Sequence, residues 1–141
     1  MRHLYSLLWR LLLPALFLRL WWRGRQAPAY RLRWRERLAC YGGQQQLPAC
    51  VWVHAVSVGE TLAAAPMIEQ LLQRYPDTRL LVTTMTPTGS ERVRALFGER
   101  VTHVYAPWEL PGAVRRFYTA FNPQLVLLLE TELWPNLIHE A

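Results

Sequence analysis

The sequence predicts an α/β fold, in which a parallel sheet has helices on both of its faces, preceded by an N-terminal membrane-associated helix. Two observations predict it. From Cys50 onward, short apolar runs alternate with segments of helical periodicity, whereas the first 22 residues are almost wholly apolar. The 141 residues suit one domain with a core of its own. Three segments are therefore expected: a membrane-anchoring helix over residues 1–24, a basic juxtamembrane segment and linker over 25–49, and the α/β domain over 50–141.

The N-terminal segment is the first element. The stretch from Leu4 to Trp22 is apolar, but Arg10 and Arg19 interrupt it and Pro14 lies within it. A spanning helix needs ~20 predominantly apolar residues. A helix lying in the interface or inserted shallowly is therefore favoured, with a single span close behind. A cleaved signal peptide and an ordinary core helix are less favoured.

Tryptophans and arginines around this segment predict where it meets the bilayer. Tryptophan is typical of the headgroup level, and arginine of contact with anionic headgroups. The residues expected to contact the membrane are Trp9, Trp21, Trp22, Arg19, Arg23 and Arg25. Further arginines up to Arg37 are expected either to be solvated or to meet headgroups, and Gly42 to Pro48 is expected to be the linker.

The charge is uneven along the chain. Residues 1–37 hold nine of the 16 basic residues and one acid, Glu36, whereas the remainder holds seven arginines and nine acids. The mildly acidic body argues against nucleic-acid binding, and the basic end favours an anionic membrane surface. If the first segment spans, these charges place the rest of the chain on the cytoplasmic side.

Strands and helices alternate through the rest of the chain. The expected strands are Cys50–Ala55, Arg79–Thr84, Val101–Tyr105 and Gln124–Leu129. The expected helices are Thr61–Tyr75, Thr88–Phe97, Pro111–Phe121 and one that begins near Pro135. Pro66 lies inside the first of these helices, so that this helix is expected to be kinked or to begin late.

Acidic residues follow two of the expected strands. Glu60 comes shortly after the run Val51–Val53, and Glu130 and Glu132 follow the run Leu125–Leu129. Strand ends of an open α/β sheet face its cleft, so the three carboxylates are expected at the same edge. Spacing alone favours a second role for Glu60, because Ser57-x-x-Glu60 fits a capping box.

Hydroxyl residues lie at the start of the second expected helix. Thr86, Thr88 and Ser90 can cap that helix or present hydroxyl and N–H groups to a phosphate or sugar, and capping is favoured from spacing alone. The chain has no Gly-x-Gly-x-x-Gly, no P-loop and no paired His/Cys ligands. A dinucleotide, ATP or metal site therefore has no support.

Three motifs together resemble a known family. His54-Ala-Val-Ser-Val-Gly-Glu60-Thr, Thr83-Thr-Met-Thr-Pro-Thr-Gly89-Ser and Glu130-Thr-Glu-Leu-Trp-Pro-Asn136 are similar to 3-deoxy-D-manno-octulosonic acid (Kdo) transferases of Gram-negative bacteria. The resemblance implies the GT-B architecture, two Rossmann-like domains facing across a cleft. This chain matches the N-terminal, acceptor-side domain, and is expected to be C-terminally truncated.

The resemblance also implies roles for particular residues. Glu60 would be the general base that takes a proton from a hydroxyl of the lipid A precursor as that oxygen attacks CMP-Kdo. Glu130 would stabilise charge in the transition state, with Glu132 as the fallback. The cleft on the acceptor side would include Ser57, Gly59, Thr86, Thr88 and Gly89.

The partners are implied by the same resemblance. They are the lipid A precursor, CMP-Kdo held mainly by a C-terminal domain, and an anionic membrane surface, with no nucleic acid, no cofactor and no metal. The place of action would be the cytoplasmic side of the cell inner membrane, in lipopolysaccharide biosynthesis. The alternatives are a membrane-tethered binding module, an inactive truncated fragment, and a different GT-B enzyme with a lipid acceptor. The 141 residues alone are expected to be inactive.

Overall fold

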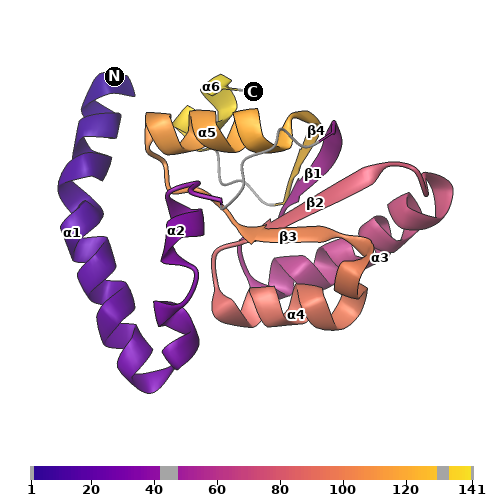
Figure 1. Cartoon of the computed structure of the whole chain (residues 1–141), viewed down its shortest axis with the longest axis horizontal. Helices are drawn as coiled ribbons and strands as arrows, with labels where there is room; N and C mark the ends of the chain where they lie inside the picture. The colour runs from indigo at the N-terminus through magenta and orange to yellow at the C-terminus, as the bar shows by residue number, and fades with distance from the viewer. Residues whose placement is uncertain (1, 42–47, 130–133, 141) are drawn as a thin grey trace.

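The computed structural model describes residues 2–41, 48–129 and 134–140, and it shows an α/β fold with a parallel sheet between layers of helices (Figure 1). The strands are β1 (Cys50–His54), β2 (Arg79–Thr84), β3 (Thr102–Tyr105) and β4 (Pro123–Leu128). The α-helices are α1 (Arg2–Gln26), α2 (Trp34–Arg37), α3 (Val58–Arg74), α4 (Pro87–Phe97), α5 (Pro111–Phe121) and α6 (Pro135–Glu140). Short 3-10 helices cover Pro28–Arg31 and Gly98–Arg100.

The strand order determines where a ligand site can lie. The four strands run in the order β3-β2-β1-β4 and all pair in parallel. The chain moves outward from β1 through β2 to β3 and then returns to the other side of β1. Strand order therefore reverses between β1 and β4, and open α/β sheets bind their ligands at such a point, beyond the carboxyl ends of the strands.

The two faces of the sheet bury different side chains. Val53 and Val82 belong to the core shared with α3 and α4, whereas Trp52 and Leu81 pack with Phe117 of α5. Successive residues of a strand point to opposite faces, which explains why neighbouring positions serve different cores. Both faces are covered, as the near-continuous apolar composition of the strands predicts.

Most predicted elements are confirmed within a few residues. Two of them, Arg79–Thr84 and Pro111–Phe121, coincide with β2 and α5. Of the two alternatives expected from Pro66, a kink or a late start, the late start is wrong, because α3 begins at Val58. Proline has no N–H, so the Leu62 carbonyl, four residues before Pro66, lacks its usual helical hydrogen bond. Leu62 is exposed, so that water can bond this carbonyl.

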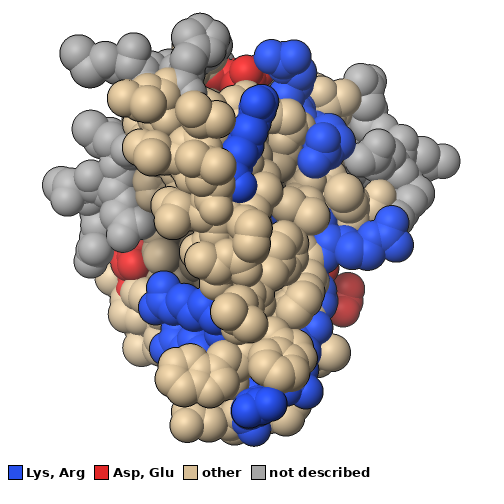
Figure 2. Space-filling view, turned by 90° about the vertical axis from the view of Figure 1, so that its left-hand side faces the viewer, with Lys and Arg blue, Asp and Glu red and all other residues tan. Residues whose placement is uncertain are grey.

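Helix α1 forms an outer layer at one side of the molecule (Figure 1). Its stretch Leu4–Gln26 is long and apolar enough to cross a membrane, and only 6% of its most apolar window is buried. Figure 2 shows this side of the molecule, a broad uncharged surface with arginines around it and few acids. The expected apolar helix is present, with Pro14 inside it. It contacts the body at two places: the Ser6 hydroxyl donates to Asn136 Oδ1 at 3.3 Å, and the ring centroid of Phe17 lies 4.9 Å from that of Trp108.

Part of the basic segment after α1 differs from the solvated or headgroup-bound stretch that its composition suggests: Arg31 and Arg35 are exposed, but Arg37 is not. Arg37 is 2% exposed, and its carbonyl accepts the backbone N–H of Trp108 at 2.8 Å. Ala39 is fully buried, and Tyr41 packs edge-on against Phe121. Residues 33–41 therefore belong to the packed body. Most of the expected linker, residues 42–47, lies outside the described residues.

Candidate active site at the carboxyl edge of the sheet

Glu60 lies in the first turn of α3, just beyond the end of β1, and is 8% exposed. Its Oε2 accepts the backbone N–H of Val56 at 2.6 Å, and its Oε1 accepts the Ser57 hydroxyl at 2.9 Å. The Glu60 N–H in turn donates to Ser57 Oγ at 3.4 Å. The predicted cap is thus confirmed, although the carboxylate reaches Val56 rather than the N–H of Ser57 itself.

These bonds leave the carboxylate able to do chemistry. A carboxylate has about four acceptor positions, and the two bonds from Val56 and Ser57 use two of them. The N-terminus of a helix also stabilises negative charge. A hydroxyl approaching Glu60 can therefore donate to it while the side chain stays held in place.

A buried hydrogen-bond chain lies at the ends of β1 and β2. The indole N–H of Trp52 donates to Thr83 Oγ1 at 2.8 Å, and the same oxygen lies 2.8 Å from Nδ1 of His54. An indole only donates, so the Thr83 hydroxyl proton is available to His54 Nδ1. Burial lowers the pKa of His54 to about 4, which keeps the ring neutral at pH 7. Its Nε2 is buried and has no hydrogen-bond partner among the described residues.

The end of β4 meets the end of β1 at this histidine. The N–H of Leu129 donates to the His54 carbonyl at 3.2 Å, and the ring of Trp134 packs edge-on against the His54 ring at 5.2 Å between centroids. Leu129 and Trp134, which lie on either side of Glu130 and Glu132 in the sequence, are therefore both beside β1. Glu130 and Glu132 themselves lie outside the described residues.

Thr86 is the N-cap of α4, and Thr88 lies in the first turn of that helix. Thr86 Oγ1 accepts the N–H of Gly89 at 3.1 Å, and the Thr88 hydroxyl donates to Thr86 Oγ1 at 3.3 Å. A Cβ on Gly89 would come within 3.2 Å of the Cβ of Thr84, so that glycine allows close packing here. Gly59 is not crowded in this way, because the nearest atom to a Cβ there would be Ser57 Oγ at 3.8 Å.

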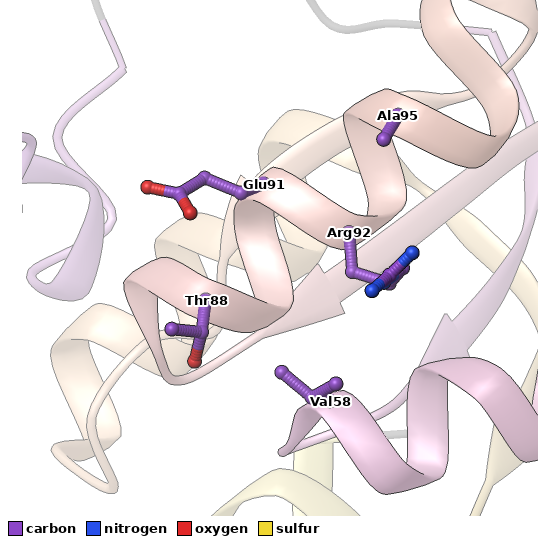
Figure 3. Close-up of a pocket in the computed structure, with 5 residues that line it drawn as sticks. All are labelled: Val58, Thr88, Glu91, Arg92 and Ala95. Carbon is purple, nitrogen blue, oxygen red and sulfur yellow. The ribbon is translucent and has the colours of Figure 1, made fainter.

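A hollow lies between the first turn of α3 and the outer face of α4 (Figure 3). It has a volume of about 480 Å³ and is lined by Val58, Thr88, Glu91, Arg92 and Ala95. In Figure 3, Thr88 and Arg92 face the side of Val58, whereas Glu91 points away. Of the five residues predicted to line the cleft, the structure brings only Thr88 to this hollow. Arg92 was missed, although its spacing of four from Thr88 is the helical signal that could have found it.

Glu109 is a second residue that sequence reasoning missed. It is 1% exposed, and its two carboxylate oxygens accept the backbone N–H groups of Asn136 and Leu137 at 2.7 and 2.9 Å. Burial raises the pKa of the Glu109 carboxyl, although these two bonds act in the opposite direction. The Asn136 amide donates to the Glu109 carbonyl at 2.8 Å. The last residue of the third motif therefore anchors α6 to the body.

The residues predicted to contact the membrane all lie on α1. Trp21 and Trp22 are 43% and 67% exposed, and Arg19 is exposed as well. The guanidinium of Arg25 lies 4.5 Å from the Trp21 ring centroid, and that of Arg23 lies 4.9 Å from the Tyr30 ring. Across residues 2–41, 48–129 and 134–140, no group of three His, Cys, Asp or Glu side chains is arranged to hold a metal ion.

Comparison with known proteins identifies the relatives of this chain. Residues 32–141 match the family described as 3-deoxy-D-manno-octulosonic-acid transferase (kdotransferase). The 3-deoxy-D-manno-octulosonic acid transferase of Haemophilus influenzae is 48% identical over 116 residues, which cover 82% of this chain and 27% of the relative. That of Bordetella pertussis is 38% identical over 148 residues, covering 99% and 34%. A probable mitochondrial enzyme of the same name from Arabidopsis thaliana is 34% identical, covering 91% and 29%. The chain thus spans about a third of the length of these curated relatives or less.

Proposed function

This chain belongs to the Kdo transferase family, and we propose that it forms the acceptor-side part of a GT-B glycosyltransferase that transfers Kdo from CMP-Kdo to a lipid A precursor. The reaction belongs to lipopolysaccharide biosynthesis. The donor CMP-Kdo binds mainly to a C-terminal domain of the whole enzyme, and no cofactor or metal takes part.

One observation carries the proposal. Glu60 combines a carboxylate, a fixed position in the first turn of α3, and a place at the carboxyl edge of the sheet where strand order reverses. A general base must be positioned before its pKa matters, and here Val56 and Ser57 fix both carboxylate oxygens.

The proposed step uses this geometry directly. Glu60 takes the proton of an acceptor hydroxyl as the hydroxyl oxygen attacks the anomeric carbon of Kdo, and CMP leaves with the bonding electrons. Glu130, or Glu132 in its place, stabilises the charge that develops. The acceptor lies along the side of the cleft that includes the starts of α3 and α4, with Thr88 at the hollow of Figure 3.

Helix α1 supports a place of action at a membrane. Its exposed leucines and tryptophans suit contact with lipid, and its last turn carries Arg23 and Arg25. We place the enzyme on the cytoplasmic side of the cell inner membrane, where a glycolipid acceptor is within reach of the sheet edge.

The donor distinguishes this function from the alternatives. The full-length protein, assayed with the lipid A precursor, should transfer Kdo from CMP-Kdo and no sugar from UDP-sugars. Transfer from a UDP-sugar instead would identify a different glycosyltransferase. Binding of the acceptor without any transfer would identify a membrane-tethered binding module.

The 141 residues alone are proposed to be inactive, because catalysis between two substrates requires both to be held in reacting geometry. Mixing the purified chain with CMP-Kdo and lipid A precursor should release no CMP above the rate without protein. Release at the rate of the full-length enzyme would mean that the donor site lies within these residues.

A further inference from the structure

A cavity of about 170 Å³ lies between α1 and the carboxyl edge of the sheet, separate from the hollow of Figure 3. Its walls come from α1, the 3-10 turn at Tyr30, α2, and the segments that come after β2 and β3. Three of the lining residues are arginines, Arg19, Arg23 and Arg37, and none is acidic. Water occupies about 30 Å³ per molecule in the liquid, so the cavity has room for on the order of five waters or a small anionic group.

The arginines of this cavity lack anionic partners. Across the described ranges, no carboxylate lies within 4.0 Å of Arg19, Arg23 or Arg37. The nearest acid in sequence, Glu36, is already used, since it binds Arg33 and accepts the Tyr105 N–H. Arg19 and Arg23 are exposed and can be solvated, whereas Arg37 is buried, so that the lack of a counter-charge is costly at Arg37.

Arg37 is the buried arginine of the cavity, and its side chain is held in a fixed position. Its side chain is 2% exposed and is held by the Met85 carbonyl at 3.0 Å and by the Tyr105 ring, whose centroid lies 4.3 Å away. Its Nε is buried and has no hydrogen-bond partner in the described part of the chain. A buried charged donor left unpaired is costly. Burial lowers the pKa of Arg37, because the charged guanidinium is removed from water.

The remaining walls divide into a polar and an apolar half. Thr86, the N-cap of the eleven-residue helix α4, lines the cavity and adds the positive end of that helix to the arginines. The apolar part comes from Trp9, Leu16 and Leu20 of α1, the helix that also carries Arg19 and Arg23. The other face of α1 carries the exposed leucines that suit the bilayer. A ligand that fits both halves has an anionic head and an apolar body.

We propose that this cavity binds a phosphomonoester group carried by a membrane lipid. A phosphomonoester carries about −1.5 to −2 charges at pH 7, which matches a cluster of arginines better than a single carboxylate does. The planar guanidinium also binds phosphate oxygens in pairs. The inference rests on the proposed function for its ligand class, a lipid at the membrane surface.

The cavity is also connected to Glu60. Arg37 donates to the Met85 carbonyl, and the Met85 N–H donates to the Val56 carbonyl at 3.0 Å. The Val56 N–H in turn donates to Glu60. A lipid phosphate bound here is therefore fixed relative to the proposed base through one backbone–backbone bond and two bonds between a side chain and the backbone. This makes the arginines positioning residues for a phosphorylated acceptor.

The test measures binding by the full 141-residue chain in neutral detergent micelles. Dioctanoyl phosphatidic acid presents a phosphomonoester and dioctanoyl phosphatidylglycerol a phosphodiester, and inorganic phosphate tests the free ion. Tryptophan emission reports binding, because Trp9 and Trp108 both line the cavity. We expect phosphatidic acid to bind at least about tenfold more tightly than either of the other two.

Matched variants separate the cavity from general charge. The double substitution Arg19→Gln/Arg23→Gln should weaken phosphatidic acid binding by about 10- to 100-fold, as expected for charged hydrogen bonds. The control Arg10→Gln/Arg25→Gln removes two arginines of the same helix that are equally exposed but do not line the cavity, and should weaken binding less than about fivefold in total. Arg37→Lys keeps the charge but loses Nε, and should fall between the two.

Three outcomes would overturn the inference. They are equal losses in the two double variants, equal binding of the two lipids, and binding of inorganic phosphate as tight as that of phosphatidic acid. None of these measurements requires sugar transfer. A failure here therefore leaves the role of Glu60 open to its own test, and an enzyme that binds phosphatidic acid but transfers no Kdo would refute only the proposed function.

Discussion

The carboxylate of Glu60 accepts the backbone N–H of Val56 across 2.6 Å, the shorter of its two bonds to the turn between β1 and α3. The bond ties the first turn of the helix to the strand end, so that the carboxylate cannot swing away from the sheet edge. A cap and a catalytic base ordinarily compete as explanations for such a residue. Here the cap supplies the fixed position that a base requires.

The first prediction separates these two roles. In the full-length enzyme, Glu60→Gln should lower Kdo transfer by about 100- to 10,000-fold, because an amide cannot accept the proton. The amide oxygen can still accept the Val56 N–H, so that melting should be nearly unchanged. Transfer rate and thermal melting should be measured on the same preparation.

Ser57→Ala is the matched control for that experiment. It removes one bond to Glu60 and the helix cap, and should destabilise the protein by about 0.5–2 kcal/mol. Its loss of transfer should be smaller than that of Glu60→Gln. Near-normal transfer in Glu60→Gln would leave Glu60 as a cap only.

The second prediction concerns stability at acid pH. Burial lowers the pKa of His54 to about 4, and burial, followed by the charges of Arg33 and Arg94, lowers that of His103 to about 3. Both folded-state values lie below the unfolded value of about 6.5. The free energy of unfolding that each neutral, buried histidine contributes is therefore fully present above pH ~6.5. It is lost as the pH falls from ~6.5 to about 4 for His54 and to about 3 for His103.

Urea denaturation between pH 7.5 and 5 measures this effect. Each histidine contributes a slope of at most about 1.4 kcal/mol per pH unit below its unfolded pKa. His103→Asn should reduce the slope, and a double variant with His54→Gln should reduce it further. An unchanged slope in the double variant would show that other groups cause the acid sensitivity.

The sequence predicted the body of the fold well because its elements are local and strongly patterned. The run Arg79–Thr84 is apolar and β-branched, and it coincides with β2. Glu60 was placed correctly for a similar reason, since a capping box and a preceding strand are both read within a few residues.

The remaining features depend on partners far along the chain. Arg37 resembles its solvated neighbours in sequence, and only Met85, 48 residues away, and Tyr105 make it a buried residue. The sequence around Glu109 contains no recognisable motif, because its two carboxylate oxygens accept N–H groups that lie 27 and 28 residues further along the chain. No local pattern carries such information.

The third prediction concerns the membrane helix. Deletion of residues 1–22 should abolish sedimentation of the chain with vesicles, because the exposed leucines and tryptophans of α1 are lost. The body should stay folded, since only 6% of the apolar window of α1 is buried. Circular dichroism checks the fold, and full-length chain with the same vesicles is the control. Undiminished sedimentation of a folded truncated chain would place the membrane contact elsewhere.

The last prediction concerns Glu109, which holds the start of α6 by both of its carboxylate oxygens. Glu109→Ala leaves the N–H groups of Asn136 and Leu137 buried without acceptors, and each unsatisfied group costs about 1–3 kcal/mol. We expect a loss of about 2–5 kcal/mol in unfolding free energy, measured by urea denaturation. Glu140→Ala is the matched control, because the Arg115–Glu140 pair at 3.4 Å is partly exposed and should change stability by less than about 1 kcal/mol. Equal effects of the two substitutions would mean that the Glu109 carboxylate contributes no more to holding α6 than the exposed Arg115–Glu140 pair does. A large effect of Glu109→Ala would show that a carboxylate outside the three motifs secures the segment whose Trp134 packs on His54 beside the proposed site.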